Sequence, residues 1–330
     1  MYAPVDHASD CARWASLVYG GVYDSTITQV ADGLPTSSLS CEAVVADMLD
    51  SMILEPGHTT LELGTATGRN AALLATRAGP GRVTSVEFDP DLAAAAHTNL
   101  AATDTHVELV VGDGELGAPG AGPFDRVMAT YAVEMVPWAW VEQTRPGGRI
   151  VTPWGRLGHV ALTVAPDGRS ATGWMQGLAT FMPARGIGQG RSWEQVRGDE
   201  APEAQGLFGR DLEPLRRDAN VLFALRVILP DVRIRTESSQ GVTAWVHDGN
   251  TSWATIVASE AGRTVAYQGG PRRLATELGE AWHAWETSGA PGLYDYGMTR
   301  TPEEQYLWSN DPDTGPRWPT AAPLLGTAKQ

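Results

Sequence analysis

The chain is poor in cysteine and in positive charge, and both shortages exclude classes of protein. Its 330 residues include two cysteines, Cys11 and Cys41, too few for a disulfide framework or a cysteine-based metal cluster. We expect no bound metal. The 24 Lys and Arg are outnumbered by 39 Asp and Glu, giving a formal net charge of −15. This charge argues against nucleic acid as a partner, because phosphates would be repelled, but not against a basic peptide.

Long apolar runs and a secretion signal are also missing. No stretch approaches the roughly 20 apolar residues that span a bilayer, and the first residues lack the charged, apolar and small-residue regions of a signal peptide. We therefore expect a cytoplasmic monomer with no membrane partner. A length of 330 residues suits one large domain or two ordinary ones.

One stretch, residues 59–90, has the pattern of a nucleotide-like binding site. Residues 60–63 form a short apolar segment typical of a strand, the turn Gly64–Gly68 follows, and residues 70–77 have a helical composition. A second strand, residues 82–86, then ends at Glu87. Small residues let the backbone approach a ligand, and an acid about twenty residues later can bind both ribose hydroxyls.

The spacing of the glycines indicates which ligand. A dinucleotide site has the pattern G-x-G-x-x-G, whereas this chain has G-x-x-x-G preceded by Glu62. A carboxylate is a poor neighbour for a pyrophosphate but a good one for a cation. S-adenosylmethionine carries a sulfonium and an ammonium group, so the pattern favours it. The alternative is a tight strand-to-helix turn in some other α/β protein.

The units that follow predict a doubly wound, mostly parallel sheet. Asp113 lies between Gly112 and Gly114 at the end of a third strand, where it either accepts a hydrogen bond from an adenine amino group or belongs to a plain turn. Ligands of such sheets lie across the carboxyl ends of the strands. The remaining elements of this half are expected as a helix at 11–19, a helix at 92–102, strands at 107–111 and 124–130, a turn at 146–149 and a strand from 150.

A hydroxyl-rich segment, residues 35–40, precedes an amphipathic helix at 41–52. One interpretation is that Ser38 or Ser40 caps this helix. The other is that the hydroxyls also line the ligand pocket, because the segment lies one helix upstream of the glycine turn.

Five segments together resemble the protein-L-isoaspartate (D-aspartate) O-methyltransferase family. They are LELGTATGRNAALLA, VTSVEFDPDL, VVGDGELG, FDRVMATYAVEMVP and RPGGRIVTPWG, and the resemblance covers about residues 36–185. It implies a Rossmann-like class I methyltransferase fold that binds S-adenosyl-L-methionine, releases S-adenosyl-L-homocysteine and methylates an Asp or isoAsp carboxylate in a protein or peptide. It implies Ser38 as the catalytic residue that orients this carboxylate. The implied cofactor-binding residues are Thr36, Ser37, Glu62, Gly64, Thr65, Ala66, Gly68, Asn70, Glu87, Phe88, Gly112, Asp113 and Gly114.

Three features depart from the family pattern. Ala66 replaces the middle glycine of the turn, which we expect to be tolerated only if its φ is negative. The proline and histidine that usually follow the serine are absent, and Leu39, Ser40 and Cys41 stand in that region. The third departure is length, because the common form of the family has no counterpart for residues beyond about 202.

The helix and strand patterns of the additional residues predict a second, smaller α+β domain. We expect a methyltransferase domain at 1–204 and an accessory, substrate-recognition domain at 205–330, with helices at 212–229 and 271–287 and strands at 242–246, 252–259 and 264–268. We interpret most of its tryptophans as core residues. A peptide-binding surface among its aromatic side chains stays open, with Trp308 as an exposed candidate.

With its additional C-terminal domain, the chain resembles the extended members of this family that modify ribosomally made peptides (lasso peptides, lanthipeptides and graspetides). The resemblance implies that the enzyme methylates an aspartate and that the ester collapses to an aspartimide. The alternatives are general repair of isoaspartate and a non-catalytic peptide-binding protein with a degenerate cofactor pocket. A carboxylate with a pKa near 4 is already ionised at pH 7, so the methyl transfer needs no general base. We expect none of the seven histidines to be catalytic.

Overall fold

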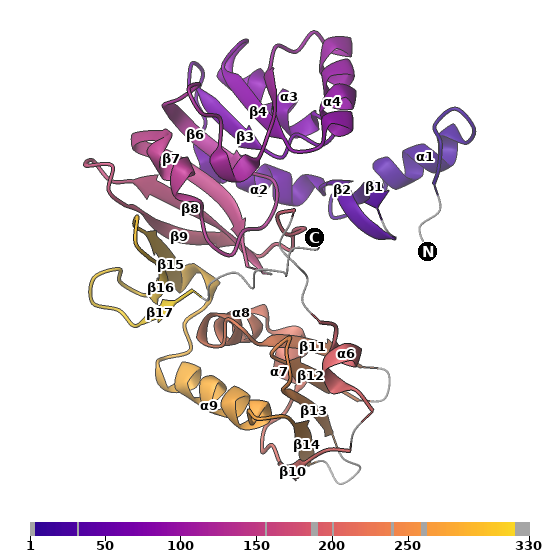
Figure 1. Ribbon diagram of the computed structural model, residues 1–330, viewed down its shortest axis with the longest axis vertical. Coiled ribbons are helices and arrows are strands. Elements are labelled where there is room, and N and C mark those ends of the chain that lie inside the picture. The colour runs from indigo at the N-terminus through magenta and orange to yellow at the C-terminus, as the bar shows by residue number, and fades with distance from the viewer. Residues whose placement is uncertain are drawn as a thin grey trace, which may run out of the picture. The chain divides into compact units, whose positions relative to one another are not determined.

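The computed structural model describes residues 4–31, 33–155, 157–185, 191–199, 201–238, 241–258 and 263–320, which form two compact units (Figure 1). Unit 1 comprises Met1–Ala184 and Met298–Gln305, and unit 2 comprises Arg185–Gly297 and Tyr306–Gln330. The division lies earlier in the chain than the expected boundary at 204/205. It is also not a single cut, because the chain returns to unit 1 near its end.

Unit 1 is built on a parallel sheet, as the sequence predicts. Its parallel strands, in spatial order, are β7 (Thr144–Trp154), β6 (Phe124–Ala129), β3 (Thr60–Leu63), β4 (Val83–Glu87) and β5 (Glu108–Val111). The order reverses between β3 and β6, which is the switch point where doubly wound sheets bind ligands. Antiparallel strands extend the sheet beyond β7, in the order β8 (Gly158–Val164), β9 (Ala171–Gly177) and the Met298–Arg300 part of β15 (Tyr296–Arg300).

Helices of unit 1 bury apolar side chains against this sheet. Met48 and Met52, one helical turn apart on α2, share a core with Leu74 of α3 and with Met128 and Val151 of the strands. Asp89 caps α4 by accepting hydrogen bonds from the backbone N–H groups of residues 91 and 92. The helices of this unit are α1 (Cys11–Val18), α2 (Glu42–Met52), α3 (Arg69–Ala78), α4 (Pro90–Ala102) and α5 (Trp138–Glu142), with a 3₁₀ turn η1 (Gly114–Leu116).

The hydroxyl-rich segment is a strand. β1 (Thr26–Ala31) and β2 (Leu34–Leu39) form an antiparallel hairpin. The capping interpretation of Ser38 and Ser40 is wrong, because Cys41 is the N-cap residue of α2 and makes no side-chain capping bond. Cross-strand bonds use the neighbouring hydroxyls instead: Thr36 bonds Gln29 and Ser37 bonds Thr28.

The expected turn at 146–149 lies inside β7. The pairing of β6 with β7 shifts register between Phe124 and Arg126, whose partners are Thr144 and Arg149. β7 therefore has three more residues than β6 between these two pairs. Because Thr144 already pairs with Phe124, the strand begins earlier than predicted.

Unit 2 is an α+β unit with an antiparallel sheet. Its strands, in spatial order, are β10 (Ala204–Leu207), β14 (Thr264–Gly269), β13 (Trp253–Ala258), β12 (Thr243–His247) and β11 (Arg233–Glu237). Helix α9 packs on this sheet and against α8 (Figure 1). The helices are α6 (Trp193–Arg197), α7 (Glu213–Arg217), α8 (Ala219–Ile228) and α9 (Leu274–Thr287), with a 3₁₀ turn η2 (Leu293–Asp295).

Two expectations for unit 2 need correction. The single helix predicted at 212–229 is two helices, because Asp218 leaves helical geometry and caps α8 through the N–H of Asn220. Trp308 is not an exposed aromatic residue, since its side chain is 0% exposed. It lies in β16 (Gln305–Ser309), opposite Arg317 of β17 (Arg317–Pro319).

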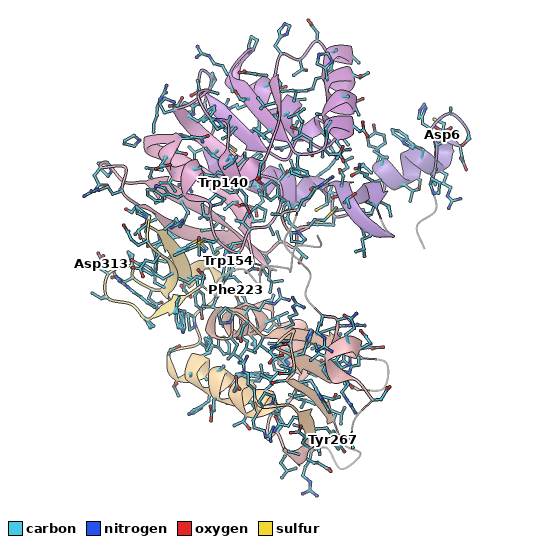
Figure 2. The ribbon with its side chains drawn as sticks, viewed as in Figure 1. Asp6, Trp140, Trp154, Phe223, Tyr267 and Asp313 are labelled. Atoms are coloured by element: carbon cyan, nitrogen blue, oxygen red, sulfur yellow. The ribbon has the colours of Figure 1, made fainter. Side chains whose placement is uncertain are left out.

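Most of the other tryptophans support the core interpretation. Trp253, Trp282 and Trp285 are buried in unit 2, as is Phe223 (labelled in Figure 2), whose ring meets Tyr296 at 5.3 Å. Among the residues that the structure describes, no helix is long and apolar enough to cross a membrane.

Candidate functional site

Glu62, at the end of β3, is a fully buried carboxylate. Its Oε1 accepts a 2.7 Å hydrogen bond from Asn70 of α3, and its Oε2 accepts one from the Ser85 hydroxyl of β4. The Ser85 hydroxyl also lies 2.6 Å from Thr65 Oγ1. Burial raises the pKa of Glu62 to about 7; the Ser85 and Asn70 bonds oppose this shift and the Glu87 charge adds to it. Glu62 thus links β3 to β4 and α3, Ser85 extends the network to the turn, and the charge of Glu62 changes near neutral pH.

The turn after β3 requires glycine at two of its positions. Gly64 and Gly68 have φ values of 94° and 83°, in the left-handed region. A Cβ on Gly64 would lie 2.4 Å from Thr130 Oγ1, so the position is also closed sterically. Thr130 donates a 2.7 Å hydrogen bond to the Gly64 carbonyl and thereby ties the end of β6 to the turn.

Ala66 also has a left-handed backbone, with φ 49°. The expectation of a negative φ is therefore wrong. A left-handed conformation costs a residue with a Cβ about 1–2 kcal/mol, and a hydrogen bond from the Ala66 N–H to Glu87 Oε2, at 2.8 Å, holds the backbone there. The turn keeps a conformation that glycine usually adopts even though alanine occupies the position.

Glu87, at the end of β4, faces this turn. Its side chain is 6% exposed, and each oxygen accepts one backbone hydrogen bond: Oε2 from Ala66, and Oε1 from Asp89 at 3.1 Å. A carboxylate can accept about four hydrogen bonds, so acceptor capacity remains. The next residue in the chain, Phe88, is an apolar residue that is 58% exposed.

Asp113 follows β5, next in the sheet. The Gly112 N–H donates to the Glu87 carbonyl at 2.9 Å, so the two segments meet. Asp113 is exposed, and its Oδ1 accepts a 2.9 Å bond from the Glu115 N–H at the start of η1. This bond belongs to the turn itself, and a bond from Asp113 to an adenine group stays a prediction.

Two aromatic residues that the sequence did not point to lie beside the glycine-bearing turns: Tyr131 contacts both turns, and Trp140 contacts the one at Gly114. A Cβ would come within 3.0 Å of Tyr131 Cδ1 if added to Gly64, and within 2.3 Å of Tyr131 Oη if added to Gly114. Trp140 donates a 2.8 Å hydrogen bond to the Gly114 carbonyl and meets the Tyr131 ring edge-to-face at 6.3 Å. Trp140 is labelled in Figure 2. The position of Tyr131, just after the strand at the switch point, is the signal that could have identified it.

Tyr131 remains a neutral hydrogen-bond donor. Burial raises the pKa of its hydroxyl, and the charges of Asp113, Glu115 and Glu87 raise it further. Within the part of the chain that the structure describes, this hydroxyl makes no hydrogen bond. It is therefore available to a ligand between the two turns.

Hydrogen bonds connect the β1–β2 hairpin to Asp89, two residues after Glu87. Thr36 donates to Gln29 Oε1 at 2.8 Å, and Gln29 donates to Asp89 Oδ2 at 3.0 Å. Ser37 is 5% exposed and accepts a bond from Thr28 at 2.9 Å. Ser38 is half-buried, and its hydroxyl makes no hydrogen bond to any described residue, which leaves it available for a substrate.

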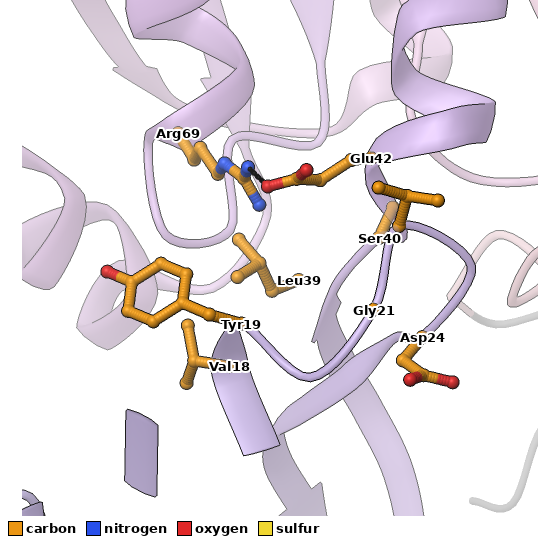
Figure 3. Close-up of a pocket in the computed structure, with 9 residues that line it drawn as sticks. Val18, Tyr19, Gly21, Asp24, Leu39, Ser40, Glu42 and Arg69 are labelled. Carbon is orange, nitrogen blue, oxygen red and sulfur yellow. Dashed lines mark hydrogen bonds and ion pairs between the residues drawn. The ribbon is translucent and has the colours of Figure 1, made fainter. Parts of the chain in front are cut away.

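A hollow of about 180 Å³, open to solvent, lies beside the same hairpin (Figure 3). Ser40 lines it, whereas Ser38 does not, and an ion pair of 2.7 Å joins Arg69 to Glu42 at its edge. Arg69 is the first residue of α3, immediately after the glycine turn. The full lining is Val18, Tyr19, Gly21, Val22, Asp24, Leu39, Ser40, Glu42 and Arg69. In the described ranges, no cluster of three or more His, Cys, Asp or Glu residues could hold a metal ion.

Comparison with solved structures defines the class of fold. A structure titled protein-L-isoaspartate O-methyltransferase matches with a TM-score of 0.51 and 20% identity, covering 87% of this chain and 86% of its own. The fold is that of a class I methyltransferase. A match over 87% of the chain must include much of unit 2, so that structure has a counterpart to the additional length.

Sequence comparison defines the family. The family model described as protein-L-isoaspartate(D-aspartate) O-methyltransferase matches residues 15–172. A protein-L-isoaspartate O-methyltransferase of Archaeoglobus fulgidus is 34% identical over 151 residues, which are 45% of this chain and 69% of that protein. One of Aeropyrum pernix is 41% identical over 138 residues, 40% of this chain and 53% of that protein. The chain belongs to the protein-L-isoaspartate O-methyltransferase family, although it spans only about half the length of relatives such as the Aeropyrum protein.

Proposed function

We propose that this protein is an S-adenosylmethionine-dependent carboxyl O-methyltransferase that acts on an aspartate or isoaspartate side chain in a protein or peptide. The observation that carries the proposal is the Glu87 carboxylate. It is held by two backbone N–H groups against the glycine turn and has acceptor capacity left for two ribose hydroxyls. The names of the relatives supply the reaction type.

The residues present fit the cofactor. The left-handed turn would let the backbone approach a ligand, the exposed Phe88 follows Glu87 in the chain, and Asp113 follows the adjacent strand. Glu62 is fully buried and already accepts hydrogen bonds from Asn70 and Ser85. It would therefore favour a cationic ligand through its charge across the turn rather than by direct contact.

The chemistry asks little of the protein. When bound, S-adenosylmethionine supplies an electrophilic methyl group. The acceptor carboxylate is ionised at pH 7 and needs no base, so the protein must desolvate it and aim one oxygen. The Ser38 hydroxyl suits this task, because a neutral donor orients a carboxylate without the tight ion pair that an arginine would form. Tyr131 helps to exclude water beside the turn.

For the acceptor, we propose a ribosomally made peptide whose aspartyl ester closes to an aspartimide, in a cytoplasmic monomer. The support is the sequence resemblance, together with a second unit that has its own sheet and core. General isoaspartate repair is the second candidate. It is favoured by the solved isoaspartate methyltransferase whose fold match extends into unit 2.

Two measurements test these proposals. Calorimetry with S-adenosylmethionine and S-adenosylhomocysteine tests cofactor binding, and a chain that binds neither is the non-catalytic alternative. Methyl transfer to an isoaspartyl test peptide, compared with the same peptide carrying aspartate, separates the acceptors. Turnover on generic isoaspartyl peptides favours repair, whereas activity confined to a peptide encoded beside this gene favours the peptide-modifying role.

A further inference from the structure

We propose that Arg300 and Gln305 are positioning residues of the candidate site, an inference that rests on the proposed function. Both belong to unit 1 although they come from near the end of the chain. They hold the middle of the segment Tyr131–Trp140. Its two ends contact the turns at Gly64 and Gly114. We call these two side chains the clasp.

Gln305 bonds the backbone on both sides of Met135. Its Nε2 donates to the Glu134 carbonyl at 2.9 Å, and its Oε1 accepts from the Val136 N–H at 2.7 Å. The side chain is 4% exposed, so little water is available to replace either bond. Removing one partner would leave a buried backbone group unsatisfied, which is more costly than losing an exposed hydrogen bond.

Arg300 holds the next atoms of the same segment. Its Nε donates to the Val136 carbonyl at 2.7 Å, and its guanidinium lies 5.5 Å from the centre of the Trp138 ring. Nη1 bonds the carbonyls of Thr301 and Glu304 within its own hairpin. The side chain is 6% exposed. Together with Gln305, it fixes both backbone polar groups of Val136.

The held segment leads directly to the site. Val136 precedes Pro137, the N-cap residue of α5, which makes no side-chain capping bond. The start of this short helix therefore depends on its neighbours. Two residues into α5, Trp140 bonds the Gly114 carbonyl beside Asp113 and meets Tyr131. A shift of residues 134–136 would move Trp140 and, with it, the turn at Asp113 that we predict to bind adenine.

The place of the clasp along the chain distinguishes it from ordinary core packing. Gly297 and Tyr306, which flank Met298–Gln305, both belong to unit 2. The chain leaves unit 2, contributes these eight residues to unit 1 and returns. A segment that only filled the core of unit 1 would not need to bond three backbone groups of the segment after β6.

The test uses full-length variants Gln305→Met and Arg300→Met, with Arg300→Lys as the conservative change and Thr299→Val as the matched control. Thr299 lies on the same strand but bonds Thr172 of β9 at 3.2 Å. We expect Gln305→Met and Arg300→Met to raise the dissociation constant of S-adenosylhomocysteine about tenfold at temperatures where each variant is folded. Arg300→Lys should recover part of the loss, and the control should bind like the wild type.

Amide hydrogen exchange of the wild-type protein provides a second readout that does not depend on the variants folding. Binding of S-adenosylhomocysteine should slow exchange in residues 112–116 and in residues 134–138 together. Affinities of both Met variants within twofold of the control would overturn the clasp, as would slowed exchange at 112–116 alone. A wild type that binds neither S-adenosylmethionine nor S-adenosylhomocysteine would instead refute the proposed function.

Discussion

Glu62→Gln should make the protein more stable above neutral pH and a poorer binder of S-adenosylmethionine. The substitution keeps the size of the side chain and its bond from Asn70, and it removes the charge. Burial raises the pKa of Glu62 from 4.5 to about 7. Between these values the unfolded chain has lost the proton while the folded chain still holds it. The contribution of Glu62 to the free energy of unfolding therefore falls as pH rises through this window and is lowest above it.

The magnitude follows from the size of the shift. A shift from 4.5 to about 7, at about 1.4 kcal/mol per pKa unit, corresponds to a cost of about 3 kcal/mol above pH 7. Glutamine does not titrate, so the variant should lack this cost at pH 8 and differ little from the wild type near pH 4.5. Cofactor affinity should change in the opposite direction, because the variant offers no negative charge to the ammonium and sulfonium groups.

Urea unfolding and calorimetry at pH 5, 6.5 and 8 measure both effects. The control is Glu55→Gln, which removes an exposed carboxylate outside the site. The wild-type affinity should rise with pH while that of Glu62→Gln stays flat. Two results would refute the reasoning: a Glu62→Gln variant whose stability follows the wild-type pH profile, or one that binds the cofactor with wild-type affinity at pH 8.

Three further predictions concern single residues of the site. Glu87→Ala should weaken S-adenosylmethionine binding, since two hydrogen bonds to a charged acceptor are lost at about 1.5–3 kcal/mol each before water compensates; an unchanged dissociation constant in a folded variant contradicts the assignment. Ser38→Ala should lower single-turnover methylation while sparing cofactor affinity and, since Ser38 caps no helix, thermal stability; unchanged turnover contradicts its role. Ala66→Gly should raise the free energy of unfolding by up to about 1 kcal/mol, because relief of the left-handed strain exceeds the entropy that glycine adds to the unfolded chain; a loss of stability in urea unfolding contradicts this.

The parallel half of the fold could be predicted because its information is local. Each strand, turn and helix from residue 60 to 129 has its own composition, and the rule that ligands lie at the carboxyl ends of parallel strands relates Glu62, Glu87 and Asp113. The structure describes all three at strand ends. The rule gives position and not exposure, so it could not show that Glu62 is buried.

The rest depends on tertiary contacts that no short pattern contains. Ala66 takes a left-handed backbone because the Glu87 carboxylate, 21 residues away, accepts its N–H. Residues 35–40 resemble a helix-capping segment, but pairing with β1 makes them a strand. Residues 212–229 read as one helix, yet Asp218 caps a new helix inside them. In each case a longer-range partner or a cap overrides the local preference.

Because the chain returns to unit 1 at Met298–Gln305, truncation after unit 1 removes part of unit 1 as well as unit 2. A protein ended at residue 204 would lose Met298–Gln305 together with unit 2. It would therefore lack the bonds of Arg300 and Gln305 to residues 134–136. Loss of activity in such a protein could not be assigned to substrate recognition, because the same cut disturbs the segment that carries Tyr131 and Trp140. Point substitutions on the surface of unit 2 leave these bonds intact, so a change in Michaelis constant at unaltered cofactor affinity can then be attributed to unit 2 itself.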